Sequence, residues 1–144
     1  MAIYKKLLEF QKKGITLAKD GTNPHFKSSY VTLNEVLAKV KGPLNEMGIV
    51  IMQHPGLSGP INDRTTPGLY TTLIDTEDDD RVECFMPYVE ATTAQKLGSN
   101  NTYNRRYSLV TLLGLEDEDD DGNVASAPSF AKAKAKEEDD LNLD

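Results

Sequence analysis

The chain has 144 residues, of which 38% are apolar and 27% charged, and its formal net charge is -7, which together predict one domain with an acidic tail. It contains no run of about 18 apolar residues, which excludes a membrane-spanning helix of ordinary length. It also lacks a secretion signal at its start, so we expect a cytoplasmic protein whose single cysteine, Cys84, forms no internal disulfide.

The first two predicted elements are helices. A broken apolar stripe predicts a helix over residues 1–19, which ends in turn residues. A regular 3.6-residue stripe predicts a second helix, whose apolar face consists of Leu33, Val36, Leu37, Val40, Leu44 and Met47. Thr32 and Glu35 have the spacing of a capping box at its start. We expect the Gly-Pro pair at 42–43 to kink or interrupt this helix and Gly48 to end it.

Three strands are predicted next, at 49–54, 69–74 and 81–86, because these segments are short and rich in β-branched and aromatic residues. The acidic segment 75–80 is predicted to form the hairpin loop between the last two strands. The segment 57–67 is rich in Gly, Pro and Ser and is predicted to be a longer, mobile loop.

The last predicted element is a helix over 92–115, interrupted or preceded by a turn at 98–101. Tyr103 and Tyr107 share one face of it, which we expect to point toward the sheet. The order of elements predicts an α+β fold. In this fold, N-terminal helices precede a three-stranded antiparallel β-meander and a following helix, and the helices cover one face of the sheet.

The negative charge is concentrated at the C-terminal end. Residues 1–113 hold 13 Lys+Arg and 12 Asp+Glu, a net charge of +1, whereas residues 114–144 hold 3 Lys and 11 Asp+Glu, a net charge of -8. Blocks of like charge are commonly solvated tails. We therefore expect a folded domain over 1–123, nearly neutral with local basic patches, and a disordered acidic tail over 124–144.

The strongest chemical cluster is Asn104-Arg105-Arg106, flanked by Tyr103 and Tyr107. Arginine binds phosphate through two parallel hydrogen bonds, and aromatic rings stack on bases at about 1–3 kcal/mol per base. The cluster therefore suits single-stranded nucleic acid. Two core tyrosines and two surface arginines would give the same pattern, and residues alone leave both interpretations open.

A second cluster is the polar and aromatic segment 23–30, which contains the basic residue Lys27. It is interpreted either as a loop that contacts a DNA strand or another subunit, or as a connector whose Phe26 and Tyr30 fill the core. Residues alone do not decide between these two interpretations.

Other chemistries find little support in the sequence. A Gly-x-x-x-x-Gly-Lys-[Ser/Thr] phosphate loop does not occur, which argues against the use of ATP. The acids of 117–122 imitate the first half of a calcium loop, but Pro128 stands where the bidentate Glu is required. Two histidines and one cysteine are too few for a structural zinc site. We predict no catalytic residues, no metal and no cofactor, and hence no enzyme.

The segment 23–30, followed by the helix 33–47, resembles the opening motif of the ERF (essential recombination function) family of phage single-strand annealing proteins. The segment 98–109, followed by Leu112-Leu113-Gly114 and the acidic run 119–123, is similar to that family's second motif. The resemblance covers roughly residues 1–123.

The resemblance implies ATP-independent binding of single-stranded DNA and annealing of complementary strands in phage homologous recombination. It also implies a β-β-β-α annealing core and homo-oligomers that form rings or filaments. By this resemblance, we expect Arg105 and Arg106 to contact phosphate and Tyr103 to stack or position. The remaining members of the expected DNA-binding set are Asn104, Lys27 and Lys96, the last two as supporting cations.

Two alternatives stay open. One is a protein that coats single-stranded DNA without annealing it. The other is an interaction protein whose acidic end docks a host replication factor, such as a single-stranded DNA-binding protein.

Overall fold

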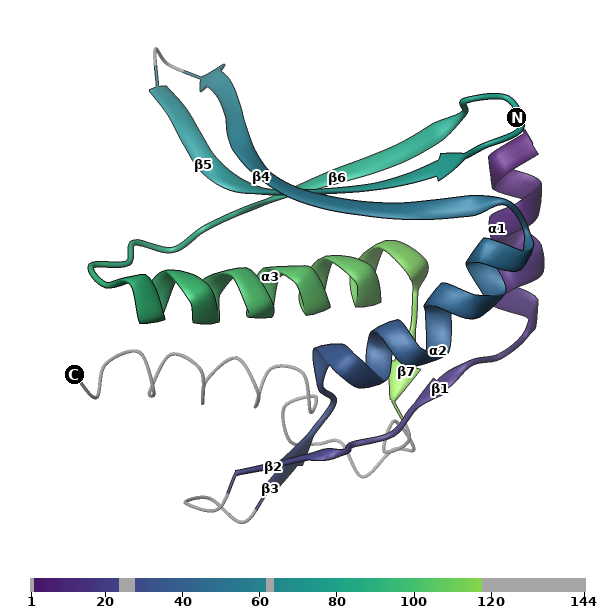
Figure 1. Ribbon diagram of the computed structural model, residues 1–144, viewed down its shortest axis with the longest axis horizontal. Coiled ribbons are helices and arrows are strands. Elements are labelled where there is room, and N and C mark those ends of the chain that lie inside the picture. Colours follow the sequence, from purple (N-terminus) through teal and green to yellow (C-terminus); the bar gives the residue numbers. More distant parts are fainter. Residues whose placement is uncertain (1, 24–27, 62–63, 118–144) are drawn as a thin grey trace.

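The computed structural model describes residues 2–23, 28–61 and 64–117, and it combines helices with antiparallel sheets (Figure 1). Its helices are α1 (Ala2–Lys12), α2 (Leu33–Glu46) and α3 (Ala94–Leu113). The main sheet has the order β4-β5-β6, and its antiparallel strands are Ile49–Ile61, Arg64–Asp75 and Arg81–Pro87. The predicted α+β class is therefore confirmed.

The main sheet packs one face on α3, and no described helix covers its other face (Figure 1). Alternation along β5 explains this, because Leu69, Thr71 and Leu73 are buried toward α3. Tyr70 and Ile74 point to the opposite face and stay partly exposed. The core joins the sheet to α1, α2 and α3 through Ile3, Phe10, Val36, Val40, Leu44, Leu73, Leu109 and Leu113.

The predicted cap of α2 is confirmed in part. The Oγ1 atom of Thr32 accepts the backbone N–H of Glu35 at 3.1 Å. The carboxylate of Glu35 does not return to Thr32 but accepts the backbone N–H of Ala18 at 2.6 Å. Asp20 accepts the N–H of Thr32 at 3.1 Å instead. The helix start is therefore tied to the segment that precedes it.

The N-terminal helix is shorter than the sequence predicts. It ends at Lys12 rather than near residue 19, and Gly14 then adopts a left-handed φ of 62°. Short strands follow in its place: β1 (Thr16–Leu17) pairs in parallel with β7 (Glu116–Asp117), and β2 (Gly21–Asn23) pairs with β3 (Ser28–Tyr30). Strands of two or three residues are too short to leave a periodic signal in the sequence.

Prolines interrupt the elements less than the sequence predicts. α2 continues through Pro43. The predicted loop 57–67 is wrong, because β4 and β5 extend into it as a long hairpin. Pro55 lies in an edge strand, and Pro67 lies one residue before the first pair of β5 with β6. The N–H that each proline lacks therefore does not remove hydrogen bonds to two neighbouring strands at once.

Candidate nucleic-acid interface on helix α3

Two buried asparagines attach α3 to the end of β6 and to the chain that follows it. Asn104 is 3% exposed, and its Nδ2 donates to the carbonyl oxygens of Met86 and Pro87 at 3.2 and 3.1 Å. The Oδ1 of Asn100 accepts the N–H of Val89 at 3.2 Å, and its Nδ2 donates to the carbonyl oxygen of Val89 at 3.0 Å. The helix is therefore continuous where the sequence predicts a turn, because these amides bind a neighbouring segment rather than their own backbone.

Arg106 joins the two sequence motifs in space. It is 2% exposed, and its Cζ atom lies 5.7 Å from the ring centroid of Tyr30 and 5.6 Å from that of Tyr103. Both distances are those of cation–π contacts. Tyr30 ends β3, which lies across α3 from the main sheet (Figure 1). Arg106, expected to contact phosphate, thus places its guanidinium inside the fold, between the 28–30 strand and the helix.

Tyr103 and Tyr107 share one face of α3, as their i, i+4 spacing predicts, and their rings stack with centroids 5.5 Å apart and planes 25° apart. They do not face the main sheet as predicted, because Asn100 and Asn104 occupy that side of the helix. Tyr103 instead contacts the guanidinium of Arg106, and Tyr107 stacks on Tyr103. We call Tyr30, Tyr103, Arg106 and Tyr107 the Tyr–Arg cluster.

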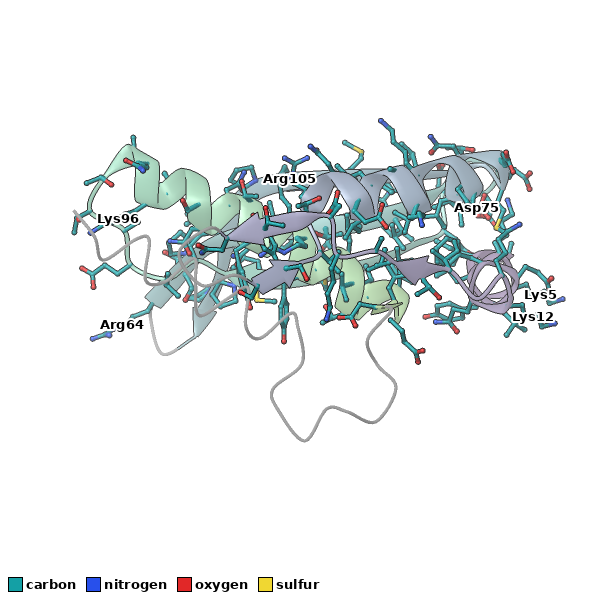
Figure 2. The ribbon with its side chains drawn as sticks, turned by 90° about the horizontal axis from the view of Figure 1, so that it is seen from below. Lys5, Lys12, Arg64, Asp75, Lys96 and Arg105 are labelled. Carbon is teal, nitrogen blue, oxygen red and sulfur yellow. The ribbon has the colours of Figure 1, made fainter. Side chains whose placement is uncertain are left out.

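Arg105 lies outside this cluster, on the side of α3 that meets β4. The Nε2 of Gln53 donates to the backbone carbonyl oxygen of Arg105 at 3.0 Å and to the Oγ1 of Thr71 at 2.9 Å. These two bonds fix the backbone of Arg105 while its side chain stays partly exposed, at the edge of the molecule (Figure 2). Solvent therefore reaches the guanidinium of Arg105, while the backbone that carries it is held in place.

Lys96 lies in the first turn of α3, where the Oγ1 of Thr93 accepts its backbone N–H at 3.1 Å. Lys96 and Arg105 are nine residues apart, which at about 100° per residue places them on opposite sides of the helix. The structure therefore does not bring these two cations onto one face (Figure 2). Lys27 and the acidic run 119–123 lie outside the described residues.

Sequence reasoning missed Gln53 and the structural role of Asn100. A signal for Gln53 exists, since it is a polar residue at an inward position of β4, in line with Ile49 and Ile51. Asn100 carries no comparable signal, because its partner, Val89, is reached only through the turn after β6.

Across residues 2–23, 28–61 and 64–117, no three His, Cys, Asp or Glu side chains gather closely enough to hold a metal ion. In the same residues, no helix is both long and apolar enough to cross a bilayer. The partly exposed guanidinium of Arg105 can pair with phosphate, whereas Arg106 and the stacked rings of Tyr103 and Tyr107 belong to the Tyr–Arg cluster.

The comparison with protein families agrees with the two motifs that meet at Arg106. The ERF superfamily model matches residues 3–142, nearly the whole chain, and it extends into the acidic segment that the sequence assigns to a tail. No curated protein and no solved structure shows significant similarity to the chain. Because the match covers far more than half of its length, the chain belongs to the ERF superfamily.

Proposed function

We propose that the protein binds single-stranded DNA and anneals complementary strands without ATP. The observation that carries this proposal is the ERF match over residues 3–142, since this family points to phage recombination and strand annealing and is generally not enzymatic. The meeting of the two family-like motifs at Arg106 supports it, because the contact links segments that are distant in the sequence.

In this proposal, Arg105 contacts the phosphate backbone, and Lys96 adds a supporting cation on another side of α3. Arg106 and Tyr103 support the site without contacting DNA themselves. The guanidinium packs between Tyr30 and Tyr103 and so positions the segment that leads to Lys27. Asn104 fixes the helix on the sheet. Annealing requires that a protein screen phosphate repulsion and leave base edges free to pair, so it needs no catalytic base.

A homo-oligomer, ring or filament, belongs to the same proposal. Residues 1–113 carry a net charge of only +1, so one copy offers few phosphate contacts. Repetition of one modest contact along a strand gives a continuous track, and linked contacts raise affinity through effective concentration.

Binding of a fluorescent single-stranded oligonucleotide, followed by anisotropy at several salt concentrations, tests the site. We expect Arg105→Ala to weaken binding and to reduce the slope of log K against log salt by about 0.7 for each phosphate that the protein no longer neutralises. Lys5→Ala is the matched control, since Lys5 lies on α1 at one end of the molecule, away from Arg105 (Figure 2). Equal affinities and slopes for wild type and Arg105→Ala would reject Arg105 as a phosphate contact.

A further inference from the structure

A row of three aromatic rings crosses the face of the main sheet that turns away from α3. Tyr70 is paired with His54 in β4 and with Phe85 in β6, so the three residues lie side by side on neighbouring strands. The ring centroids of His54 and Tyr70 are 5.4 Å apart with planes 23° apart, and those of Tyr70 and Phe85 are 4.9 Å apart with planes 55° apart. We call these residues the aromatic row.

The sheet holds the aromatic row in place. The hydroxyl of Tyr70 donates to the carbonyl oxygen of Leu57 at 2.8 Å, which draws its ring across β4. The Nδ1 of His54 lies 3.2 Å from the carbonyl oxygen of Pro55, a hydrogen bond in the Nδ1–H tautomer. The rings are therefore oriented before any ligand arrives.

Two glycines make room for the rings to lie close to the sheet. A Cβ atom at Gly56 would stand 3.0 Å from the ring of Tyr70, and one at Gly68 would stand 2.5 Å from the Cζ of Phe85. The rings thus occupy the space above two backbone positions that have no side chains. The glycines shield one side of these rings, and solvent reaches the other side, since Tyr70 and Phe85 are partly exposed and His54 is exposed.

The strands of this face carry two arginines and one acid, and the acids of residues 77–80 adjoin Arg81 at the turn between β5 and β6. Strand alternation places Arg64 and Arg81 on the same face as Tyr70, near the two ends of β5. The acid at the outward positions of these strands is Glu83, and its Oε2 already accepts the hydroxyl of Thr72 at 2.7 Å. Aromatic rings between cations are the combination that single-stranded nucleic acid uses, with bases on rings and phosphates on cations.

We propose that His54, Tyr70 and Phe85 form a stacking platform for the bases of single-stranded DNA, on the sheet face opposite α3. This proposal rests on the proposed function and adds a second contact of a different kind, one that recognises bases rather than phosphate. It also separates the two contacts, since Arg105 lies on α3 and the aromatic row lies across the sheet from it.

The test compares a poly-dT oligonucleotide with a fully abasic oligonucleotide of the same length, which carries the phosphates but no bases. We expect His54→Ala to weaken binding of the poly-dT strand at least fivefold and to leave binding of the abasic strand unchanged. Phe85→Leu should act in the same way, since it keeps an apolar side chain but removes the ring. Melting temperature identifies any variant that is misfolded.

The control is Met52→Ala, on the same face and 50% exposed but not aromatic. If His54→Ala binds both strands like wild type, or if Met52→Ala weakens binding as much as His54→Ala, the platform is rejected. Weaker binding of both strands together with a smaller oligomer mass by light scattering would also reject it, because the face would then join copies of the chain. If wild type binds neither strand, the proposed function itself fails, and the two failures are thus distinguishable.

Discussion

Arg105 and Arg106 are neighbours in the sequence but have different surroundings. The helix turns by about 100° between them, which leaves Arg105 partly exposed and packs Arg106 between two tyrosine rings. An arginine buried on aromatic rings contributes through packing as well as charge. The doublet therefore combines one candidate contact with one structural residue.

We expect Arg106→Ala to lower the free energy of unfolding by at least about 1 kcal/mol, since it removes two cation–π contacts and buried packing. We expect Arg105→Ala to change the free energy of unfolding by less than about 0.5 kcal/mol, as for most surface substitutions. Urea denaturation of both variants measures the difference. Equal decreases in stability would contradict the division of roles.

We expect Asn104→Ala to lower the free energy of unfolding by about 1–3 kcal/mol, because it leaves the carbonyl oxygens of Met86 and Pro87 without their side-chain donor. Thr102→Ala, at an exposed position of the same helix, serves as the control. Denaturation curves that coincide for wild type and Asn104→Ala would argue against an anchoring role.

The Tyr–Arg cluster could be predicted only in part. The i, i+4 spacing of Tyr103 and Tyr107 predicts that they share one face of the helix, and their stacked rings confirm this. The burial of Arg106 could not be predicted, because its partner Tyr30 belongs to a strand whose three residues leave no pattern. Sequence periodicity reports neighbours along one element and says little about contacts between distant segments.

Helix α1 is tied to the main sheet by an ion pair. The Nζ of Lys6 lies 2.9 Å from the Oδ1 of Asp75, whose side chain is fully buried, and 3.2 Å from Glu77. The hydrogen bond from Lys6 lowers the pKa of Asp75, and the same bond raises the pKa of Lys6. The pair therefore stabilises the fold above the ordinary pKa of an aspartate, and this stabilisation disappears as the pH falls through the lowered value.

We expect Lys6→Met to be less stable than wild type at pH 7, because it leaves a buried carboxylate without its cation. The difference in melting temperature should shrink as the pH falls below about 4, since a protonated Asp75 no longer requires the ammonium group. Lys5→Met, at an exposed position of α1, should show no such change. A difference that stays constant down to about pH 3 would contradict the role of this ion pair.

Two glycines are expected to respond in opposite directions to the same substitution. Gly68→Ala should lower the free energy of unfolding by about 1–3 kcal/mol, because its Cβ would collide with the carbonyl oxygen of Met86 and with the ring of Phe85. Gly98→Ala should raise it by about 0.5–1 kcal/mol, since its Cβ would meet nothing within 4 Å and alanine favours the helix. Thermal or urea unfolding of the two variants measures both changes. A change in the free energy of unfolding with the same sign in both variants would contradict this packing.

The elements with strong periodicity could be predicted, and those set by tertiary contacts could not. The apolar stripe of α2 and its Thr32 cap are confirmed. The continuity of α3 depends on the side-chain hydrogen bonds of Asn100. The β4–β5 hairpin can include prolines because each stands where its missing N–H is not needed by a second neighbouring strand. Neither condition is visible before the strands are paired.

In the whole molecule, the cations of residues 1–113 are nearly balanced by acids, with a net charge of +1, and residues 114–144 carry a net charge of -8. A single copy would therefore hold DNA weakly at physiological salt, because affinity falls with each phosphate contact that is missing. In the proposed homo-oligomer, several copies along one strand would compensate for this weak contact.

The most direct measurement is the rate at which two complementary oligonucleotides anneal, followed by fluorescence energy transfer without nucleotide. We expect the wild-type protein to accelerate annealing equally with and without ATP, Lys5→Ala to match it, and Arg105→Ala to be several-fold slower. A wild-type protein that is folded and binds the strands but does not accelerate their annealing would contradict the proposal and indicate a coating protein instead.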